Sequence, residues 1–476
     1  MIFLKKIVVC FLLTVFCTEL MAQQNQPGKK YNILFLLTDD QRATTIHALG
    51  NQQIITPTID KLVNSGTAFT RAYIMGGSQA AVCAPSRAMI MTGRNVYHLK
   101  DFGNTIPQQD IELGELLQQN GYDAHGIGKW HNGSASYARS FSSGGHIFFG
   151  GMSDQFNIPV WEFDSSRKYL KDSIHRQPHI NPGKNASELF ADDAVSYLQQ
   201  QDGKKPFFLY VAFTSPHDPR TSYPEYTNLY DTAKIPLPLN FLPQHPFDNG
   251  ELKIRDELLA AFPRTPGEIK LHLRDYYAMI THLDNQIGRI VKALKESGQY
   301  DNTIIVFAGD NGLAIGQHGL MGKQNVYEHS VNIPFIISGP GIPKNQQSNA
   351  FVYLLDIFPT LCQLTGVQQP SAIEGKSLVG VIKNPAAKVR TTAYFRYREF
   401  QRSVRNEQYK LIEYNVEGKR TTQLFDLTND PVEINNLYFN KAFHAQLKLL
   451  RKQLLEDKAA AGDDGIFWNG YSEYIN

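Results

Sequence analysis

The chain has 476 residues, of which 42% are hydrophobic, 11% aromatic and 19% charged. This composition is typical of globular proteins and excludes disordered, collagen-like and coiled-coil chains. The 47 Lys and Arg residues against 45 Asp and Glu residues give a formal net charge of +2, which excludes the basic excess of a dedicated nucleic-acid-binding protein.

Residues 1–22 are predicted to form a secretory signal peptide. Lys5 and Lys6 precede an apolar run at 7–17, and Ala22 provides a small residue for cleavage. The run has about eleven apolar residues, whereas a membrane-spanning helix needs ~20, so the alternative of an uncleaved anchor is disfavoured. We expect an exported protein, periplasmic or secreted, without a membrane span.

Only Cys83 and Cys362 remain after residue 22. Two cysteines do not make a disulfide framework, although a single bond between them stays open. Cys362 lies in the apolar-periodic segment 355–365, where a free cysteine acts as a small hydrophobic residue. Cys83 lies in a polar segment of an exported chain, which indicates a chemical role.

Short apolar runs alternate with amphipathic segments from residue 31 to about 365. Apolar runs of this length are typical of strands that are buried on both faces. Alternating strands and helices predict an α/β fold with a large, mostly parallel sheet between helices. In chain order we expect a strand at 31–37, a helix at 58–63, a strand at 68–74, a helix at 111–120, strands at 124–127 and 206–213 on either side of a helix at 187–201, a helix at 266–297, strands at 303–308 and 334–338, and a helix at 355–365.

The pattern changes beyond residue 386. Short strands at 394–398, 401–404, 409–414 and 421–425 are separated by turn residues and followed by a helix at 441–461. This predicts a smaller antiparallel sheet with one helix. We therefore expect a catalytic domain at 23–385 and a C-terminal subdomain at 386–476.

Polar residues follow two of the expected strands. Asp39 and Asp40 come after the first strand, and Asp310 and Asn311 come after the strand at 303–308. Either pair alone fits a helix cap or a tight turn, but ligands of open α/β sheets bind at the carboxyl ends of strands. An all-oxygen set favours Ca²⁺, or alternatively Mg²⁺, over Zn²⁺.

Cys83 opens the motif C-A-P-S-R, which ends at Arg87 and continues to T-G-R at Arg94. A second segment, G-Y-D-A-H-G-I-G-K-W-H, ends with Lys129 and His131. Both motifs resemble the signatures of the formylglycine-dependent sulfatases, which have the alkaline-phosphatase-like fold; Ala124 stands where Ser or Thr is usual. The resemblance covers about 32–436, and the surroundings of the cysteine look most like iduronate-type and bacterial polysaccharide sulfatases.

The resemblance implies that a formylglycine-generating, sulfatase-maturating enzyme oxidises Cys83 to formylglycine. This aldehyde hydrates to a diol, of which one hydroxyl attacks sulfur while the other stays free to expel sulfate. It further implies a cation that lowers the pKa of the diol and neutralises charge on the sulfate. Its ligands would be Asp39, Asp40, Asp310, Asn311 and the modified Cys83.

The same resemblance implies the remaining catalytic roles. Arg87 and Lys129 lie beside the nucleophile, and Lys323 binds sulfate. His217 is the candidate general acid, because a sugar alkoxide must be protonated as it leaves. His131 is the candidate base that deprotonates the second hydroxyl. The structural alternatives are a hydrogen-bonded histidine within the fold for each His and a solvated charge for each Lys.

Candidate sugar-binding residues are selected by the type of side chain alone. His98 and Arg220 are the two we select, because such groups suit sugar hydroxyls or a sugar carboxylate. They come from a wider set that also contains Tyr97, Asp218, Arg396 and Arg398.

We therefore expect an exported sulfatase acting on O-sulfate groups of carbohydrates, either glycosaminoglycan or other sulfated polysaccharide fragments. Two alternatives remain open. One is a phosphate or phosphonate monoester hydrolase on the same scaffold, and the other is a catalytically inactive glycan-binding protein.

Overall fold

A computed structural model describes residues 30–166, 169, 179–465 and 470–471. The predicted signal peptide lies outside these residues. Within them, no helix is both long enough and apolar enough to cross a membrane.

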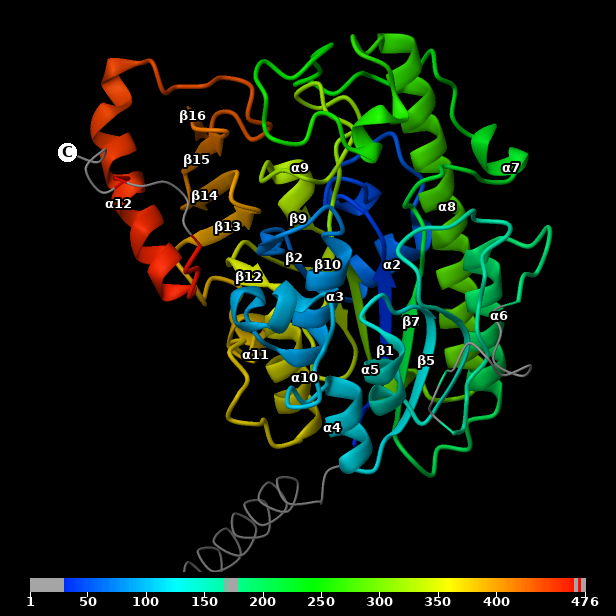
Figure 1. Cartoon of the computed structure of the whole chain (residues 1–476). Coiled ribbons are helices and arrows are strands. Elements are labelled where there is room, and N and C mark those ends of the chain that lie inside the picture. The colour runs from blue at the N-terminus through cyan, green and yellow to red at the C-terminus, as the bar shows by residue number, and fades with distance from the viewer. Residues whose placement is uncertain (1–29, 167–168, 170–178, 466–469, 472–476) are drawn as a thin grey trace, which may run out of the picture.

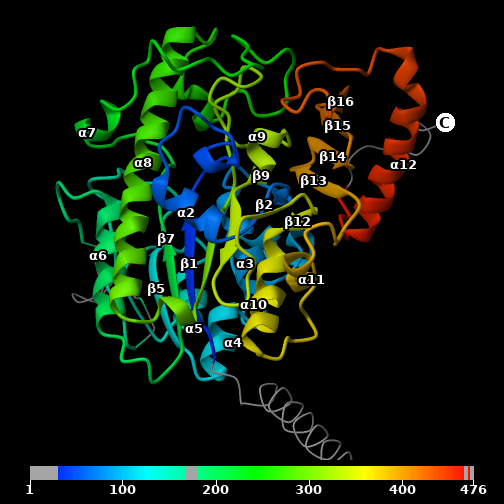
Figure 2. The same cartoon turned by 180° about the vertical axis from the view of Figure 1, so that it is seen from behind.

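An eight-stranded sheet forms the centre of the molecule (Figures 1 and 2), in the order β11-β2-β10-β8-β1-β7-β5-β6. β10 runs antiparallel to both of its neighbours, and the other pairs are parallel. The mostly parallel sheet is thus confirmed. Its strands are β1 (Asn32–Thr38), β2 (Gly66–Phe69), β5 (Asp123–Lys129), β6 (Ser143–Phe148), β7 (Phe207–Ala212), β8 (Thr303–Gly309), β10 (Phe335–Ser338) and β11 (Gln346–Ser348).

Helices cover both faces of this sheet because its strands are apolar on both sides. In β1, Leu34 and Leu36 pack in one core, and Ile33, Phe35 and Leu37 pack in another, as the two-residue period of a strand requires. Helices on the Leu34 side are α2 (Pro57–Ser65), α6 (Ala186–Gln199) and α8 (Pro266–Glu296). Helices on the opposite side are α3 (Cys83–Thr92), α4 (Leu113–Gln119), α5 (Ser134–Ser140), α10 (Ile357–Thr365) and α11 (Val379–Lys383).

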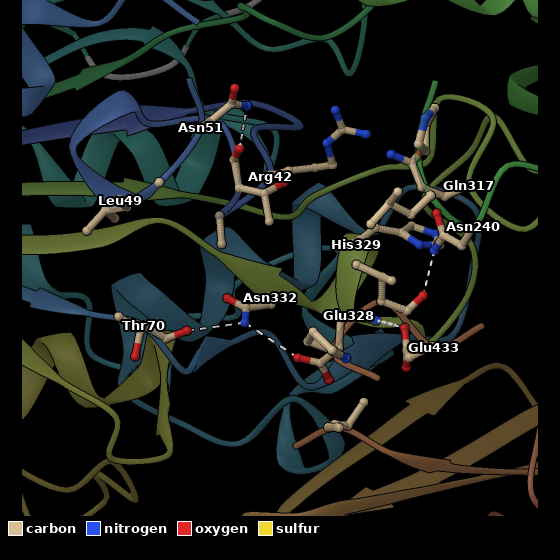
Figure 3. Close-up of a pocket in the computed structure, with 18 of the residues that line it drawn as sticks. Arg42, Leu49, Asn51, Thr70, Asn240, Gln317, Glu328, His329, Asn332 and Glu433 are labelled. Carbon is tan, nitrogen blue, oxygen red and sulfur yellow. Dashed lines mark hydrogen bonds between the residues drawn. The ribbon is translucent and has the colours of Figure 1, made fainter. Parts of the chain in front are cut away.

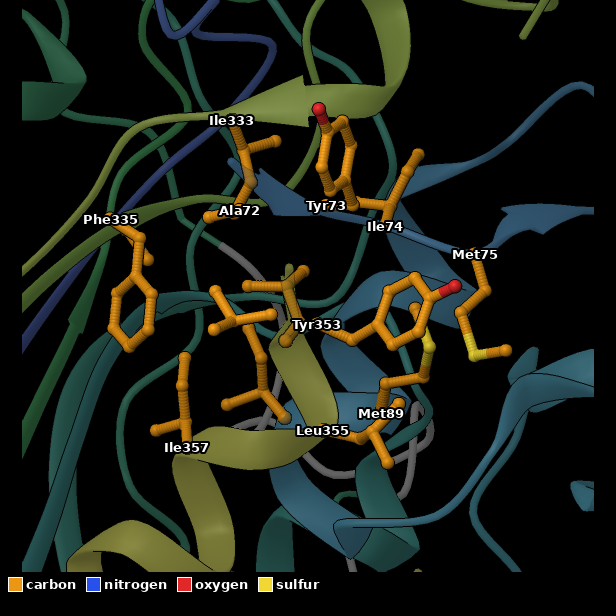
Figure 4. Packing of buried hydrophobic residues seen from close by; sticks show 14 of the residues in the cluster. Ala72, Tyr73, Ile74, Met75, Met89, Ile333, Phe335, Tyr353, Leu355 and Ile357 are labelled. Atoms are coloured by element: carbon orange, nitrogen blue, oxygen red, sulfur yellow. The ribbon is translucent and has the colours of Figure 1, made fainter. Parts of the chain in front are cut away.

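A small three-stranded sheet lies beside α3, with the strand order β12-β3-β9. Figure 4 shows Met89 of α3 packed near Met75 and Tyr353 in this core. The predicted strand at 68–74 is therefore wrong as one element, because the chain turns after Phe69 and the two halves join different sheets. The strands of this small sheet are β3 (Ala72–Tyr73), β9 (Asn332–Ile333) and β12 (Val352–Tyr353). Two short helices, α7 (Pro224–Thr227) and α9 (Glu328–Val331), interrupt the connections between longer elements.

The C-terminal part forms the predicted antiparallel sheet, with α12 (His444–Ala460) on its outer side (Figure 1). Four strands of this sheet come from the C-terminal part of the chain: β13 (Ala393–Tyr397), β14 (Gln401–Arg405), β15 (Tyr409–Val416) and β16 (Lys419–Asp426).

A fifth strand of this sheet, β4 (Gly76–Gly77), comes from the N-terminal part and runs parallel to β13. Gly76 has φ of 100°, and a Cβ there would lie 1.8 Å from the carbonyl oxygen of Arg396, so this close pairing requires glycine. The C-terminal sheet therefore includes a strand from the N-terminal side of the expected domain boundary at 386. Its first residue, Gly76, lies seven positions before Cys83.

Candidate active site

Four adjacent parallel strands, β8-β1-β7-β5, bring the predicted polar residues to one edge of the sheet. Asp310 follows β8, and its backbone N–H donates to the Thr38 carbonyl at the end of β1. Asp39 follows β1 and donates to the Ser215 carbonyl beyond β7. Lys129 is the last residue of β5. The expected convergence at the carboxyl ends of the strands therefore occurs.

Asp39, Asp40, Asp310 and Asn311 are all buried, with at most 2% exposure. Ligand atoms of Asp39, Asp40, Cys83 and His217 lie within 4.8 Å of one another. Among the described residues, the Oδ1 atoms of Asp39 and Asn311 are buried without a hydrogen-bond donor, which is costly for an oxygen. Each of these oxygens is available as a cation ligand, so the residues present fit a hard divalent ion.

Three buried, positively charged side chains face the carboxylates: Lys129, Lys323 and Arg87. Lys129 Nζ lies 2.5 Å from Asp39 Oδ2, and Lys323 Nζ lies 2.7 Å from Asp40 Oδ1. Burial alone would raise the pKa of Asp39, but the charges of Lys129, His217 and Arg87 outweigh it and hold the pKa well below its usual range. Burial and the charge of Asp39 raise the pKa of Asp310. The cluster therefore carries balanced charge in a water-poor site.

Cys83 is the first residue of α3 and is 1% exposed. Its Sγ lies 3.1 Å from Lys323 Nζ and 3.9 Å from Asp40 Oδ1. Burial raises the pKa of the thiol to about 12 despite the nearby lysines, so an unmodified Cys83 is protonated at neutral pH. A plain thiolate nucleophile is therefore disfavoured.

Arg87 follows Cys83 by one helical turn and thus lies on the same face of α3. Its Nε donates to Asp310 Oδ2 at 2.9 Å and its Nη1 donates to the Lys129 carbonyl at 2.6 Å. The side chain is 1% exposed. Arg87 thereby joins the helix of Cys83 to the two strands β8 and β5.

We expect the substitution Arg87→Met to lower the free energy of unfolding by about 3–5 kcal/mol, because it leaves the Asp310 carboxylate buried without its partner. Urea denaturation of chelator-treated protein would measure this change. Arg274→Met is the control: Arg274 is one-third exposed and pairs with the adjacent Asp275, so its loss should cost less than about 1 kcal/mol. Equal midpoints for the two variants would contradict the expectation.

The two proposed catalytic histidines differ in their surroundings. His217 Nδ1 lies 2.7 Å from the Asp218 carbonyl and donates to it, which leaves Nε2 3.6 Å from Asp40 Oδ2. His131 is half-buried, and burial together with the charges of Lys129 and Arg87 lowers its pKa well below the usual value. His131 is therefore neutral and able to accept a proton.

The candidate sugar-binding residues lie in different surroundings. Arg220 is near the site: its Nη1 lies 3.2 Å from His272 Nδ1, and the charges of Asp218 and Asp40 act on it. His98 instead contacts Glu374, with 2.5 Å between Nδ1 and Oε1.

The remaining members of the wider set make structural contacts. Tyr97 donates to the Met75 carbonyl at 2.9 Å, and Arg398 pairs with Glu251 at 2.6 Å. Arg396 pairs with the buried Asp463. Asp218 pairs with Arg255, with 3.1 Å between Oδ1 and Nη2.

Two residues near Lys323, Asp256 and Gln324, were not predicted from the sequence. Asp256 carries a charge that raises the pKa of Lys323 further, and it accepts a hydrogen bond of 2.7 Å from Gln324. Asp256 lies in a short 3-10 helix, Arg255–Leu259, whose sequence has no strand, helix or motif signal, so no pattern predicted it. Gln324 follows Lys323 directly, and this adjacency was the available signal.

A mixed sheet covered by helices, with a carboxylate and amide cluster at the carboxyl ends of its central strands, defines a hydrolase of the alkaline-phosphatase-like class. Residues 31–367 match the model of the family described as Sulfatase. Residues 316–460 match the model described as N-sulphoglucosamine sulphohydrolase, C-terminal. The chain belongs to the sulfatase family and is a sulfuric ester hydrolase.

Individual relatives span most of the chain. An N-acetylglucosamine-6-O-sulfatase of Bacteroides thetaiotaomicron is 27% identical, with 91% of this chain and 87% of the relative covered. A solved structure of a protein in complex with its substrate D-glucosamine-2-N,6-O-disulfate is 25% identical, with a TM-score of 0.77 over 92% of this chain and all of that one. The phosphonate monoester hydrolase of Agrobacterium radiobacter, 21% identical with a TM-score of 0.72 over 91% and 96%, shares the fold.

Proposed function

We propose that this enzyme is exported and hydrolyses O-sulfate esters of carbohydrates, with formylglycine at position 83 and a divalent cation, Ca²⁺ or alternatively Mg²⁺. The observation that carries the proposal is the position of Cys83 between Lys323 and Asp40 at the edge of the carboxylate and amide cluster. The carbohydrate class is supported by the relatives that act on sulfated glucosamines. Export would rest on the predicted signal peptide, and maturation would need a formylglycine-generating enzyme.

The two groups added to the chain have separate tasks. Formylglycine supplies, as its hydrate, a hydroxyl that attacks sulfur and a second hydroxyl that later allows sulfate to leave. The cation supplies positive charge beside the sulfate oxygens. The residues proposed to hold it are Asp39, Asp40, Asp310, Asn311 and the modified Cys83.

Side chains of the protein would bind the sulfate and move the protons. Lys323, which pairs with Asp40, and Lys129, which pairs with Asp39, would offer ammonium groups to the sulfate oxygens, and Arg87 would fix the helix of the nucleophile. His217 would donate a proton from Nε2 to the leaving alkoxide. His131, neutral because of its low pKa, would accept the proton of the second hydroxyl. Arg220 and His98 are the proposed contacts to the sugar.

We expect His217→Gln to lower kcat/KM on a sugar sulfate by about 10²–10⁴-fold, because the alkoxide then leaves unprotonated. On 4-nitrophenyl sulfate, whose phenolate leaves readily without a proton, the loss should be about tenfold or less. Steady-state kinetics on both substrates measure the difference. The exposed His47 provides the control His47→Gln, and an equal loss on both substrates would contradict the role of His217.

The rival activity is phosphate or phosphonate ester hydrolysis, which the shared fold permits. Turnover of 4-nitrophenyl sulfate and 4-nitrophenyl phosphate by protein made in its own host tests the proposal. We expect kcat/KM to be higher for the sulfate by at least about tenfold, a difference of 1.4 kcal/mol in transition-state binding. A preference for phosphate would favour the rival, and inactive protein with an intact site would favour the glycan-binding alternative.

A further inference from the structure

A cavity of about 730 Å³ lies outside the proposed catalytic site, and none of the proposed catalytic residues lines it. In the view of Figure 3, Arg42, His329, Gln317 and Asn240 gather on one side, and Thr70 and Asn332 lie on the other. The volume is in the range of cavities that hold small molecules. We therefore asked what the polar groups of this cavity could bind.

Arg42 is a buried cationic group of this cavity for which the described residues provide no ion pair. Its side chain is 3% exposed, and within the described part of the chain its Nε and Nη1 have no hydrogen-bond partner. The guanidinium is held instead 5.1 Å from the centre of the Tyr276 ring. Burying a charge without a partner is costly, so the site is complete only when an anion is present.

The carboxylates of the same cavity are already neutralised. Glu328 lies 2.8 Å from Arg405 and 3.0 Å from Lys410, and Glu433 lies 2.8 Å from Lys410. Arg71 adds a further positive charge to the lining. The unbalanced charge of the cavity is thus positive, and Arg42 is a buried part of it.

Neutral polar groups of the same lining supply further contacts. Both ring nitrogens of His329 are buried without a partner among the described residues, as is Asn332 Oδ1. An imidazole offers one N–H donor and the amide oxygen accepts a hydroxyl. The rest of the lining contains apolar surface that suits a sugar ring, contributed by Leu49, Pro236, Leu237, Pro238, Leu273 and Tyr277.

We propose that this cavity is a second binding site, which takes an acidic saccharide and pairs its sulfate or carboxylate group with Arg42. The anion site stands on the cavity alone, whereas the saccharide class rests on the proposed function. The site is also connected to the catalytic centre. Tyr276 accepts a hydrogen bond from the backbone N–H of Arg42 at 3.0 Å and donates to the Asp40 carbonyl at 2.7 Å.

Calorimetric titration tests the proposal with three sugars, glucose 6-sulfate, glucuronate and uncharged glucose. The protein is the Cys83→Ala variant, which cannot turn over the ligand. We expect at least one acidic sugar to bind with an affinity that Arg42→Gln and Arg71→Gln each reduce at least tenfold, and we expect glucose not to bind. The acidic sugar that binds more tightly identifies the acid group.

The surface variant Arg274→Gln is the charge-matched control. Binding that both cavity variants leave unchanged, or binding of glucose equal to that of the acidic sugars, would overturn the proposal. Arg71 is half-buried and outside the catalytic cluster, so its variant remains informative if Arg42→Gln does not fold. Hydrolysis of 4-nitrophenyl sulfate by the Arg71→Gln enzyme should be unchanged, which separates failure of this site from failure of the proposed function.

Discussion

Replacing Cys83 by alanine is expected to lower kcat for sulfate ester hydrolysis by at least about 10⁴-fold, because the nucleophile is lost while substrate binding remains. Far-ultraviolet circular dichroism should show an unchanged fold, since the small alanine fits the position of a buried cysteine. The matched control is Cys362→Ala, because Cys362 is buried in α10 and should not affect turnover. Residual activity within tenfold of the parent would contradict a nucleophile at position 83.

The serine variant distinguishes formylglycine from an ordinary hydroxyl. Serine has one hydroxyl, so a sulfate transferred to it has no neighbouring oxygen that can expel it. Cys83→Ser should therefore accumulate a sulfated form, heavier by about 80 Da, in intact-protein mass spectrometry. Parent protein from its own host should show position 83 lighter by about 18 Da than cysteine, or the hydrate. An unmodified thiol in active protein would contradict the mechanism.

Removal of the cation should have an effect of similar size. Dialysis against a chelator is expected to lower activity by more than about 10²-fold, because the positive charge that the ion supplies beside the sulfate oxygens is then lost. Adding Ca²⁺ should restore activity better than Mg²⁺, since the larger ion tolerates a ligand set without ideal octahedral geometry.

The same experiment has a readout besides activity. Saturation at 100 times the dissociation constant should stabilise the fold by about 2.7 kcal/mol, which a shift of the thermal midpoint would reveal. Asp40→Asn should reduce this shift, and Asp301→Asn, at an exposed position, should leave it unchanged. A thermal midpoint that no divalent cation alters would contradict the site.

The central sheet and its catalytic edge could be predicted because their signals are local. Each inner strand is an apolar run that ends in polar residues, and parallel strands bring such ends together. The strand expected at 124–127, for example, lies within β5, and Lys129 at its end was predicted from a motif. Helix α3 was not expected, since it is buried on every side and therefore has no amphipathic period.

Other features depend on contacts that no local pattern reports. β6 contains the sequence S-G-G-H-I-F, whose glycines and polar residues disfavour a strand, and it forms because β5 offers an edge to pair with. The uncompensated charge of Arg42 is visible only once the partners of Glu328 and Glu433 are known. His98 is close in sequence to the nucleophile, yet its partner Glu374 is 276 residues further along the chain.

The pairing of β4 with β13 joins two segments of the chain that are synthesised at different times. Gly76 precedes its partner Arg396 by 320 positions, so at 5–20 residues per second β4 waits roughly 20–60 s for the other strand to be synthesised. Throughout that interval the neighbouring Cys83 lacks the sheet that helps to enclose it. A maturating enzyme, which could not reach a 1% exposed cysteine in the finished fold, would meet an accessible substrate on the growing chain.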